Sequence, residues 1–70
     1  PTFLVHAEDD GAVPVENALL LRAALRAKGV AVDTHLFSRG GHGFGLRNTT
    51  GKPVAVWPEL FVGWAKGLLV

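Results

Sequence analysis

Two short apolar segments, with a single amphipathic segment between them, occupy the first half of the sequence. Residues 2–6 are mostly β-branched, aliphatic or aromatic and run into an acidic turn at residues 8–11, which is typical of a strand that ends at turn-forming residues. Residues 31–37 form a second strand-like segment, whose side chains alternate between two faces. Because only one helix-length segment separates the two strands, we expect them to be parallel and joined by a right-handed βαβ crossover.

The amphipathic segments predict two helices. The first extends from about residue 15 to residue 28, with Pro14 at its start and Gly29 at its end. The second extends from about residue 56 to residue 68 and has Pro58 in its first turn. The expected core-facing residues are Ala18, Leu21 and Leu25 in the first helix and Trp57, Leu60, Phe61, Trp64 and Leu68 in the second. The sequence therefore predicts an α/β chain in the order strand, helix, strand, helix.

The composition excludes several classes of protein. Hydrophobic residues make up 49% of the 70 residues and charged residues 19%, which is too apolar for a disordered chain. The sequence contains no cysteine, so a disulfide framework and a thiolate metal site are excluded. Its apolar runs are far shorter than the roughly 20 residues that span a bilayer. Because so much apolar sequence sits in so short a chain, we expect residues 1–70 to be one end of a larger domain.

The charge pattern argues against nucleic acid as a partner. The formal net charge is +1, with seven Lys and Arg against six Asp and Glu. The basic residues Arg22, Arg26 and Lys28 are expected to form a solvated face near the end of the first helix, where positive charge complements the helix dipole. We therefore expect neither a nucleic-acid partner nor a membrane partner.

Carboxylates and a histidine follow the two predicted strands at the same edge of the sheet. Residues 6–14 follow the first strand and carry the carboxylates, whereas residues 38–45 follow the second strand and carry the histidine. Open parallel sheets bind ligands beyond the carboxyl ends of their strands, and neighbouring strands lie ~4.8 Å apart. A carboxylate in one loop is thus expected to reach the imidazole in the other, an arrangement that orients a histidine as a general base.

The loop that carries the histidine is rich in glycine. Residues 40–45 contain four glycines around His42, which allow sharp turns with positive φ and leave the imidazole accessible. The alternative interpretation is a mobile surface loop that happens to contain a histidine. A phosphate-binding loop is disfavoured, because the glycine spacing differs from the dinucleotide fingerprint and no predicted helix begins directly after it.

These two loops resemble those of a known family. Residues 6–14, with the sequence HAEDDGAVP, resemble the segment after the penultimate strand of α/β-hydrolases, whose triad acid lies in a D-x-x-V-P context. Residues 40–44, with the sequence GGHGF, are similar to the loop that carries the catalytic histidine in the same fold. The similarity is greatest to small esterases related to acetyl-xylan esterases and dienelactone hydrolases, and it extends to the catalytic domain of prolyl oligopeptidases.

The resemblance implies that residues 1–70 are the C-terminal part of an α/β-hydrolase domain, with Asp10 as the triad acid and His42 as the general base. It implies hydrolysis of a small-molecule carboxylic ester, such as a short acyl group on a carbohydrate or another small alcohol, without a cofactor. The elbow G-x-S-x-G is absent, and Ser38 instead lies just before the glycine-rich residues 40–45, called the histidine loop below. The nucleophilic serine is therefore expected from the rest of the hydrolase domain, and the 70 residues alone are expected to be inactive. The alternatives are a peptidase of the prolyl oligopeptidase kind and a non-catalytic interaction module.

Neighbours of the two predicted triad residues have more than one interpretation. Asp9 is adjacent to Asp10 and is the competing candidate for the triad acid, although either aspartate also suits a turn or a helix cap. Phe44 and Leu46 follow His42 closely. They are expected either to line the substrate pocket or to anchor the loop.

A metal site has weak support in the sequence. His6 stands near two aspartates in the first loop, and His35 stands near Asp33 in the second strand. Neither group has the ligand spacing of a recognised metal motif. We therefore expect no bound metal.

Overall fold

The computed structural model describes residues 1–69 and contains the predicted order of elements. These are the strand β1 (Thr2–Ala7), the helix α1 (Glu16–Ala27), the strand β2 (Val32–Phe37), the 3-10 turn η1 (Pro53–Val56) and the helix α2 (Trp57–Gly67). The turn η1 is not predicted by the sequence analysis, and it arises because Pro53 fixes a helical φ one turn ahead of α2. Within residues 1–69, no helix is long and apolar enough to cross a membrane.

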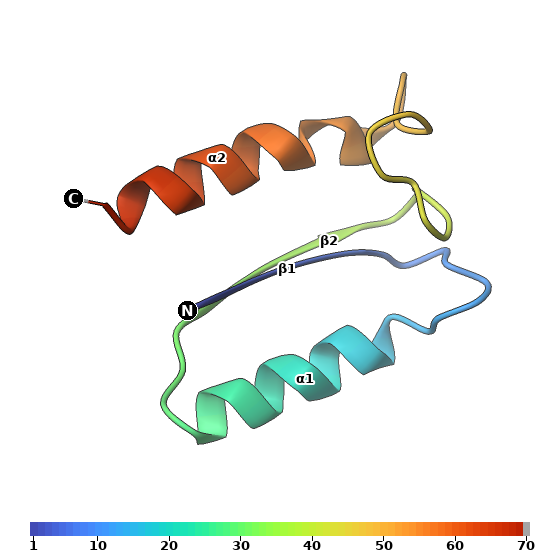
Figure 1. Cartoon of the computed structure of the whole chain (residues 1–70). Coiled ribbons are helices and arrows are strands. Elements are labelled where there is room, and N and C mark those ends of the chain that lie inside the picture. Colours follow the sequence, from blue (N-terminus) through green and yellow to red (C-terminus); the bar gives the residue numbers. More distant parts are fainter. Residues whose placement is uncertain (70) are drawn as a thin grey trace.

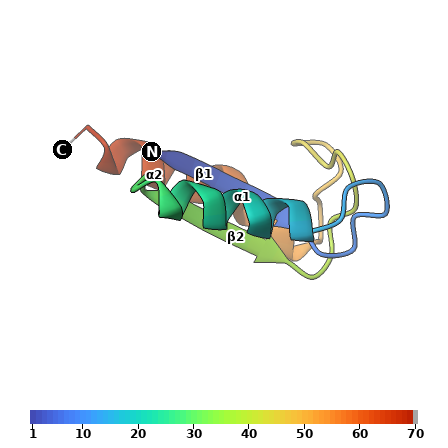
Figure 2. The ribbon, with the colours of Figure 1, turned by 90° about the horizontal axis from the view of Figure 1, so that it is seen from below.

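The two strands pair in parallel, as predicted. Thr2 lies opposite Val32 and Ala7 lies opposite Phe37, so both strands end at the same edge of the sheet. Helix α1 covers one face of this pair and α2 covers the other (Figure 1). The view from below shows the loops after both strands at one end of the molecule (Figure 2). The fold therefore places the acidic loop after β1 (residues 8–14) and the histidine loop after β2 (residues 40–45) at the same edge of the sheet.

Aromatic side chains hold α2 on the sheet. The ring of Phe3 in β1 lies 5.5 Å from the ring of Phe61 and 5.5 Å from the ring of Trp64, measured between centroids. On the same face, the imidazole of His35 lies 5.1 Å from the Phe3 ring. Edge-to-face and tilted pairs at such distances are favourable arrangements of aromatic rings. The predicted packing of Phe61 and Trp64 on the sheet is confirmed.

Helix α1 differs from the prediction at two side chains. The sequence analysis predicts a solvated Arg22, but its guanidinium donates hydrogen bonds to Thr34 Oγ1 at 2.9 Å and to the Val32 carbonyl at 3.3 Å. A long arginine side chain can lie along the helix surface while its polar end reaches the neighbouring strand. Leu21 is predicted to face the core, but it is 47% exposed. The sheet has two strands within residues 1–69 and is too narrow to cover the whole apolar face of α1.

Much of the apolar surface of both helices is uncovered. Among residues 1–69, the buried hydrophobic side chains are Ala7, Ala18 and Val54. The large hydrophobic side chains that stay exposed on or after the helices are Leu19, Leu20, Leu21, Phe61, Val62, Leu68 and Leu69. Apolar surface on this scale marks a face that packs against another part of a protein.

Gly40 allows the histidine loop to pass close to the end of the sheet. A Cβ atom at Gly40 would stand 2.9 Å from the Cβ of Ala7 and 3.3 Å from Cγ1 of Val54. Both neighbours are among the most buried residues, with exposures of 1% and 0%. The absence of a side chain at Gly40 is therefore a packing requirement rather than a matter of flexibility.

We predict that Gly40→Ala destabilises the protein by about 1–3 kcal/mol, because the added methyl group overpacks the contact with Ala7 and Val54. The measurement is the midpoint of urea unfolding. Gly11→Ala is the matched control, because a Cβ there meets no atom of the described residues within 4 Å, and its effect should stay within about 0.5 kcal/mol. Equal midpoints for the two variants would contradict the packing argument.

Candidate active site

The loop after β1 is folded around the carboxylate of Asp10. Its Oδ1 atom accepts hydrogen bonds from the backbone N–H groups of Ala12 and Val13, each at 2.8 Å. This is the local turn that aspartate commonly forms with the backbone ahead of it. The turn leaves the second oxygen, Oδ2, free to face other partners.

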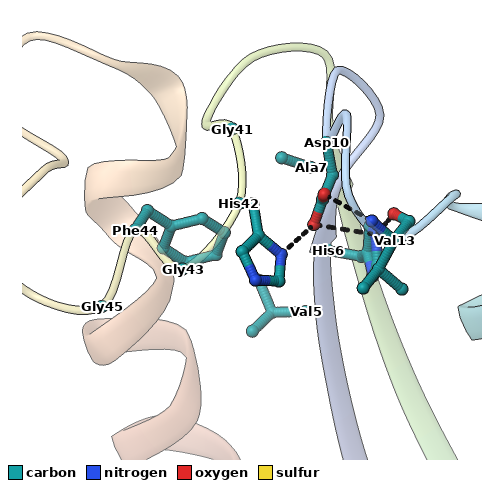
Figure 3. A pocket seen from close by; sticks show the side chains of 10 residues that line it. All are labelled: Val5, His6, Ala7, Asp10, Val13, Gly41, His42, Gly43, Phe44 and Gly45. Atoms are coloured by element: carbon teal, nitrogen blue, oxygen red, sulfur yellow. Dashed lines mark hydrogen bonds and ion pairs between the residues drawn. The ribbon is translucent and has the colours of Figure 1, made fainter.

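The side chain of His42 meets that second oxygen. Its Nδ1 atom lies 3.1 Å from Asp10 Oδ2, across 32 residues of sequence (Figure 3). Gly41 and Gly43 on either side of the histidine have φ of 71° and 64°, which a residue with a side chain rarely adopts. These two turns present the imidazole above the end of β1. The predicted contact between Asp10 and His42 is present in the structure.

The contact is asymmetric in its exposure. The Asp10 side chain is 7% exposed, whereas the His42 side chain is 58% exposed. The acid is thus enclosed by its own loop, and the imidazole projects from the site. Within residues 1–69, more than half of the His42 side chain is therefore accessible to a further partner.

The surroundings of Asp10 keep its carboxyl group ionised. The hydrogen bond from the Val13 N–H lowers the pKa of Asp10 most, and the bonds from Ala12 and His42 lower the pKa further, while partial burial opposes them. An ionised carboxylate only accepts hydrogen bonds, so Nδ1 of His42 is the nitrogen that carries the hydrogen. In the neutral ring, Nε2 then keeps a lone pair and can take a proton from a nearby hydroxyl group.

His6 is a further member of the site that the sequence analysis considered only as a metal ligand. Its Nε2 atom donates a hydrogen bond to the Val13 carbonyl at 2.9 Å and lies 3.6 Å from Asp10 Oδ2. The side chain is 15% exposed. His6 therefore closes the acidic loop from the strand side. The signal in the sequence is its position at the end of the strand, four residues before Asp10.

Phe44 and Leu46 occupy different surroundings. Phe44 lines the pocket formed by Val5, the acidic loop and His42 (Figure 3). Leu46 lines a separate depression with Phe44 and Arg47 and is 70% exposed. The structure thus places Phe44 in the same pocket as Asp10 and His42, whereas Leu46 lines a neighbouring depression that neither of them lines.

Trp57 holds the histidine loop. The sequence analysis assigns Trp57 to the surface that packs α2 onto the sheet, but its indole N–H donates to the Gly45 carbonyl at 2.9 Å. Its ring lies 6.4 Å from the ring of Phe44. At the first residue of α2 the helix has passed the end of the strands, so this aromatic side chain meets the loop instead of the sheet.

The remaining candidates lie outside this cluster. Ser38 is exposed directly after β2 and does not stand on a turn between a strand and a helix. His35 packs under α2 against Phe3. In the part of the chain that the structure describes, no group of three or more His, Cys, Asp or Glu is arranged to hold a metal ion.

Two solved structures are similar to this chain in overall fold. One is the acetyl ester-xyloside bifunctional hydrolase from Caldicellulosiruptor lactoaceticus, with a TM-score of 0.87 and 42% identity over 97% of this chain and 25% of that chain. The other is MGS-M1, an α/β hydrolase from a Medee basin deep-sea metagenome library, with a TM-score of 0.83 and 29% identity over 99% of this chain and 33% of that chain. The chain therefore matches part of an α/β-hydrolase fold.

The sequence defines the family more closely. Residues 1–67 match the prolyl oligopeptidase family, and the chain belongs to that family. It is also 37% identical over 67 residues to endo-1,4-beta-xylanase B of Butyrivibrio fibrisolvens. That match covers 96% of this chain and 9% of the xylanase, so the chain spans a small part of its curated relative. The resemblance to α/β-hydrolases stated from the two loop motifs is confirmed.

We predict that Asp10→Asn flattens the acid dependence of stability. Because the folded pKa of Asp10 is lowered, its ionised form stabilises the folded state above the ordinary pKa, and this stabilisation is lost as the pH falls. The wild-type Tm should therefore drop more steeply than that of the variant between about pH 5 and pH 3. The measurement is a thermal melt at each pH. Parallel curves for the two proteins would contradict the assigned role of the loop hydrogen bonds.

Proposed function

We propose that this chain supplies the acid and the base of a Ser-His-Asp triad in a hydrolase that cleaves carboxylic esters. Asp10 is the acid and His42 is the base. The observation that carries this proposal is the contact of 3.1 Å between His42 Nδ1 and Asp10 Oδ2, with the His42 side chain 58% exposed. A histidine held in this way by a carboxylate is suited to take a proton from a serine and to return it to a leaving group.

In the proposed mechanism, Nε2 of His42 takes the hydroxyl proton of the nucleophilic serine as the serine oxygen attacks the ester carbonyl. The tetrahedral intermediate then collapses, the bond to the alcohol breaks, and the imidazolium gives its proton to the departing alcohol. Water repeats the sequence on the acyl-enzyme, which releases the carboxylic acid and the free serine. Throughout, the Asp10 carboxylate orients the ring and stabilises the imidazolium.

The nucleophile is proposed to come from a part of the hydrolase other than residues 1–70. The sequence has no G-x-S-x-G elbow, and Ser38 stands on a loop. The uncovered leucines of α1 and the exposed end of α2 provide apolar surface for packing against such a part. The limited coverage of the matched hydrolases, 25% and 33% of their chains, also supports this division of the site.

The proposed substrate is an ester of a short acyl group, carried by a carbohydrate or another small alcohol. The support comes from the acetyl ester-xyloside hydrolase, which is 42% identical to this chain, and from the xylanase relative. The match to the prolyl oligopeptidase family favours a second candidate, a serine peptidase. Hydrolysis of aryl acetates but not of proline-containing peptides distinguishes the esterase from the peptidase.

We predict that a fluorophosphonate probe labels the serine of the full-length enzyme and that His42→Ala abolishes this labelling. The probe reacts with a serine only when a base activates it. The measurement is covalent incorporation of the probe, detected by mass spectrometry. Asp33→Asn, at an exposed position of β2, is the control and should label at the wild-type rate. Undiminished labelling of His42→Ala would reject the triad, and an unlabelled wild-type enzyme would favour a non-catalytic module.

We further predict that Asp10→Asn lowers kcat for an aryl acetate by roughly 10⁴, because the ring of His42 loses the carboxylate that fixes its tautomer. Asp9→Asn is the matched comparison, since it changes the adjacent acid. It should cost far less, because the Asp9 carboxylate contacts backbone rather than the imidazole. The assignment fails if Asp9→Asn causes the larger loss in steady-state kinetics.

A further inference from the structure

Asp9, the neighbour of Asp10, contacts the backbone of the histidine loop rather than the imidazole of His42. Its Oδ1 atom accepts a hydrogen bond from the backbone N–H of Gly41 at 2.7 Å. The two residues are 32 positions apart in the sequence. This bond therefore joins the loop after β1 to the loop after β2, immediately before His42.

The two adjacent carboxylates thus act on two adjacent residues. Asp10 faces the imidazole of His42, and Asp9 holds the backbone of Gly41. Neighbouring side chains in a turn point in different directions, so the two carboxylates make separate contacts. Asp9 thus binds the main chain of the histidine loop, and Asp10 binds the ring of His42.

The histidine loop needs such a contact because of its glycines. Glycine has more conformational freedom to lose than any other residue, so a loop with Gly41 and Gly43 beside the histidine has many competing conformations. The loop is fixed at Gly45 by the indole of Trp57. The bond from Asp9 fixes the other side, at the residue whose positive φ sets the direction of His42.

We propose that Asp9 is a positioning residue for the proposed hydrolase reaction. Its carboxylate holds the Gly41 N–H and thereby keeps the ring of His42 in reach of both Asp10 and the serine. This inference rests on the proposed function of His42. It requires a hydrogen-bond acceptor at residue 9 and does not require a negative charge there.

The test compares Asp9→Ala with Asp9→Asn in the full-length enzyme, with an aryl acetate as substrate. Asp9→Ala removes the acceptor and should lower kcat by about 10-fold or more with KM within about twofold, because a displaced base slows chemistry more than it weakens binding. Asp9→Asn keeps an oxygen of the same shape and should restore kcat to within about threefold of the wild type. Fluorophosphonate labelling rates should follow the same order.

Glu8→Ala is the matched control, because it removes a carboxylate from the same exposed turn and leaves the bond between Asp9 and Gly41 in place. It should retain wild-type kcat, and the Tm of each variant should lie well above the assay temperature. Wild-type kcat in Asp9→Ala would overturn the inference. So would equal losses in Asp9→Ala and Asp9→Asn, which would assign the effect to charge. If His42→Ala and Asp10→Asn also keep full activity, the proposed function itself fails.

Discussion

The rest of the site depends on the hydrogen bonds that the Asp10 carboxylate accepts. One oxygen is committed to the backbone N–H groups of Ala12 and Val13, so the loop after β1 takes its shape from this side chain. The other oxygen meets His42 and lies near His6. A single carboxylate thus shapes its own loop and contacts the imidazole of His42. The hydrogen bonds from the loop backbone lower the pKa of Asp10 and so keep the carboxylate that faces His42 ionised.

The histidine loop combines conformational freedom with attachment at defined points. Its glycines permit the turns that lift His42 above the strand, and Gly40 permits close passage over Ala7. Asp9 and Trp57 hold the backbone at Gly41 and Gly45. The loop is therefore held by polar contacts to its main chain, while the His42 side chain stays 58% exposed.

The sequence was sufficient for the framework and for the central contact. Residue composition, turn residues and periodicity predict both strands and both helices, and the single helix between the strands predicts their parallel pairing. The family resemblance of the two loop motifs implies that Asp10 meets His42, and the structure contains this contact. The sequence was insufficient where a side chain depends on tertiary position. The bond from Trp57 to the loop arises from where α2 begins in space, which helical periodicity does not reveal. The exposure of Leu21 likewise depends on how many strands stand beside the helix, a property that no local pattern contains.

The parallel crossover has a consequence for how the proposed site can be inherited. The proposed acid, Asp10, and the proposed base, His42, both follow strands of one βαβ unit and stand 32 positions apart, so their contact is encoded within one contiguous part of the chain. Insertions elsewhere in a gene, or fusion to another module, leave that stretch intact. If the proposed roles of Asp10 and His42 hold, such a pair can be inherited as a unit while the surfaces around it change.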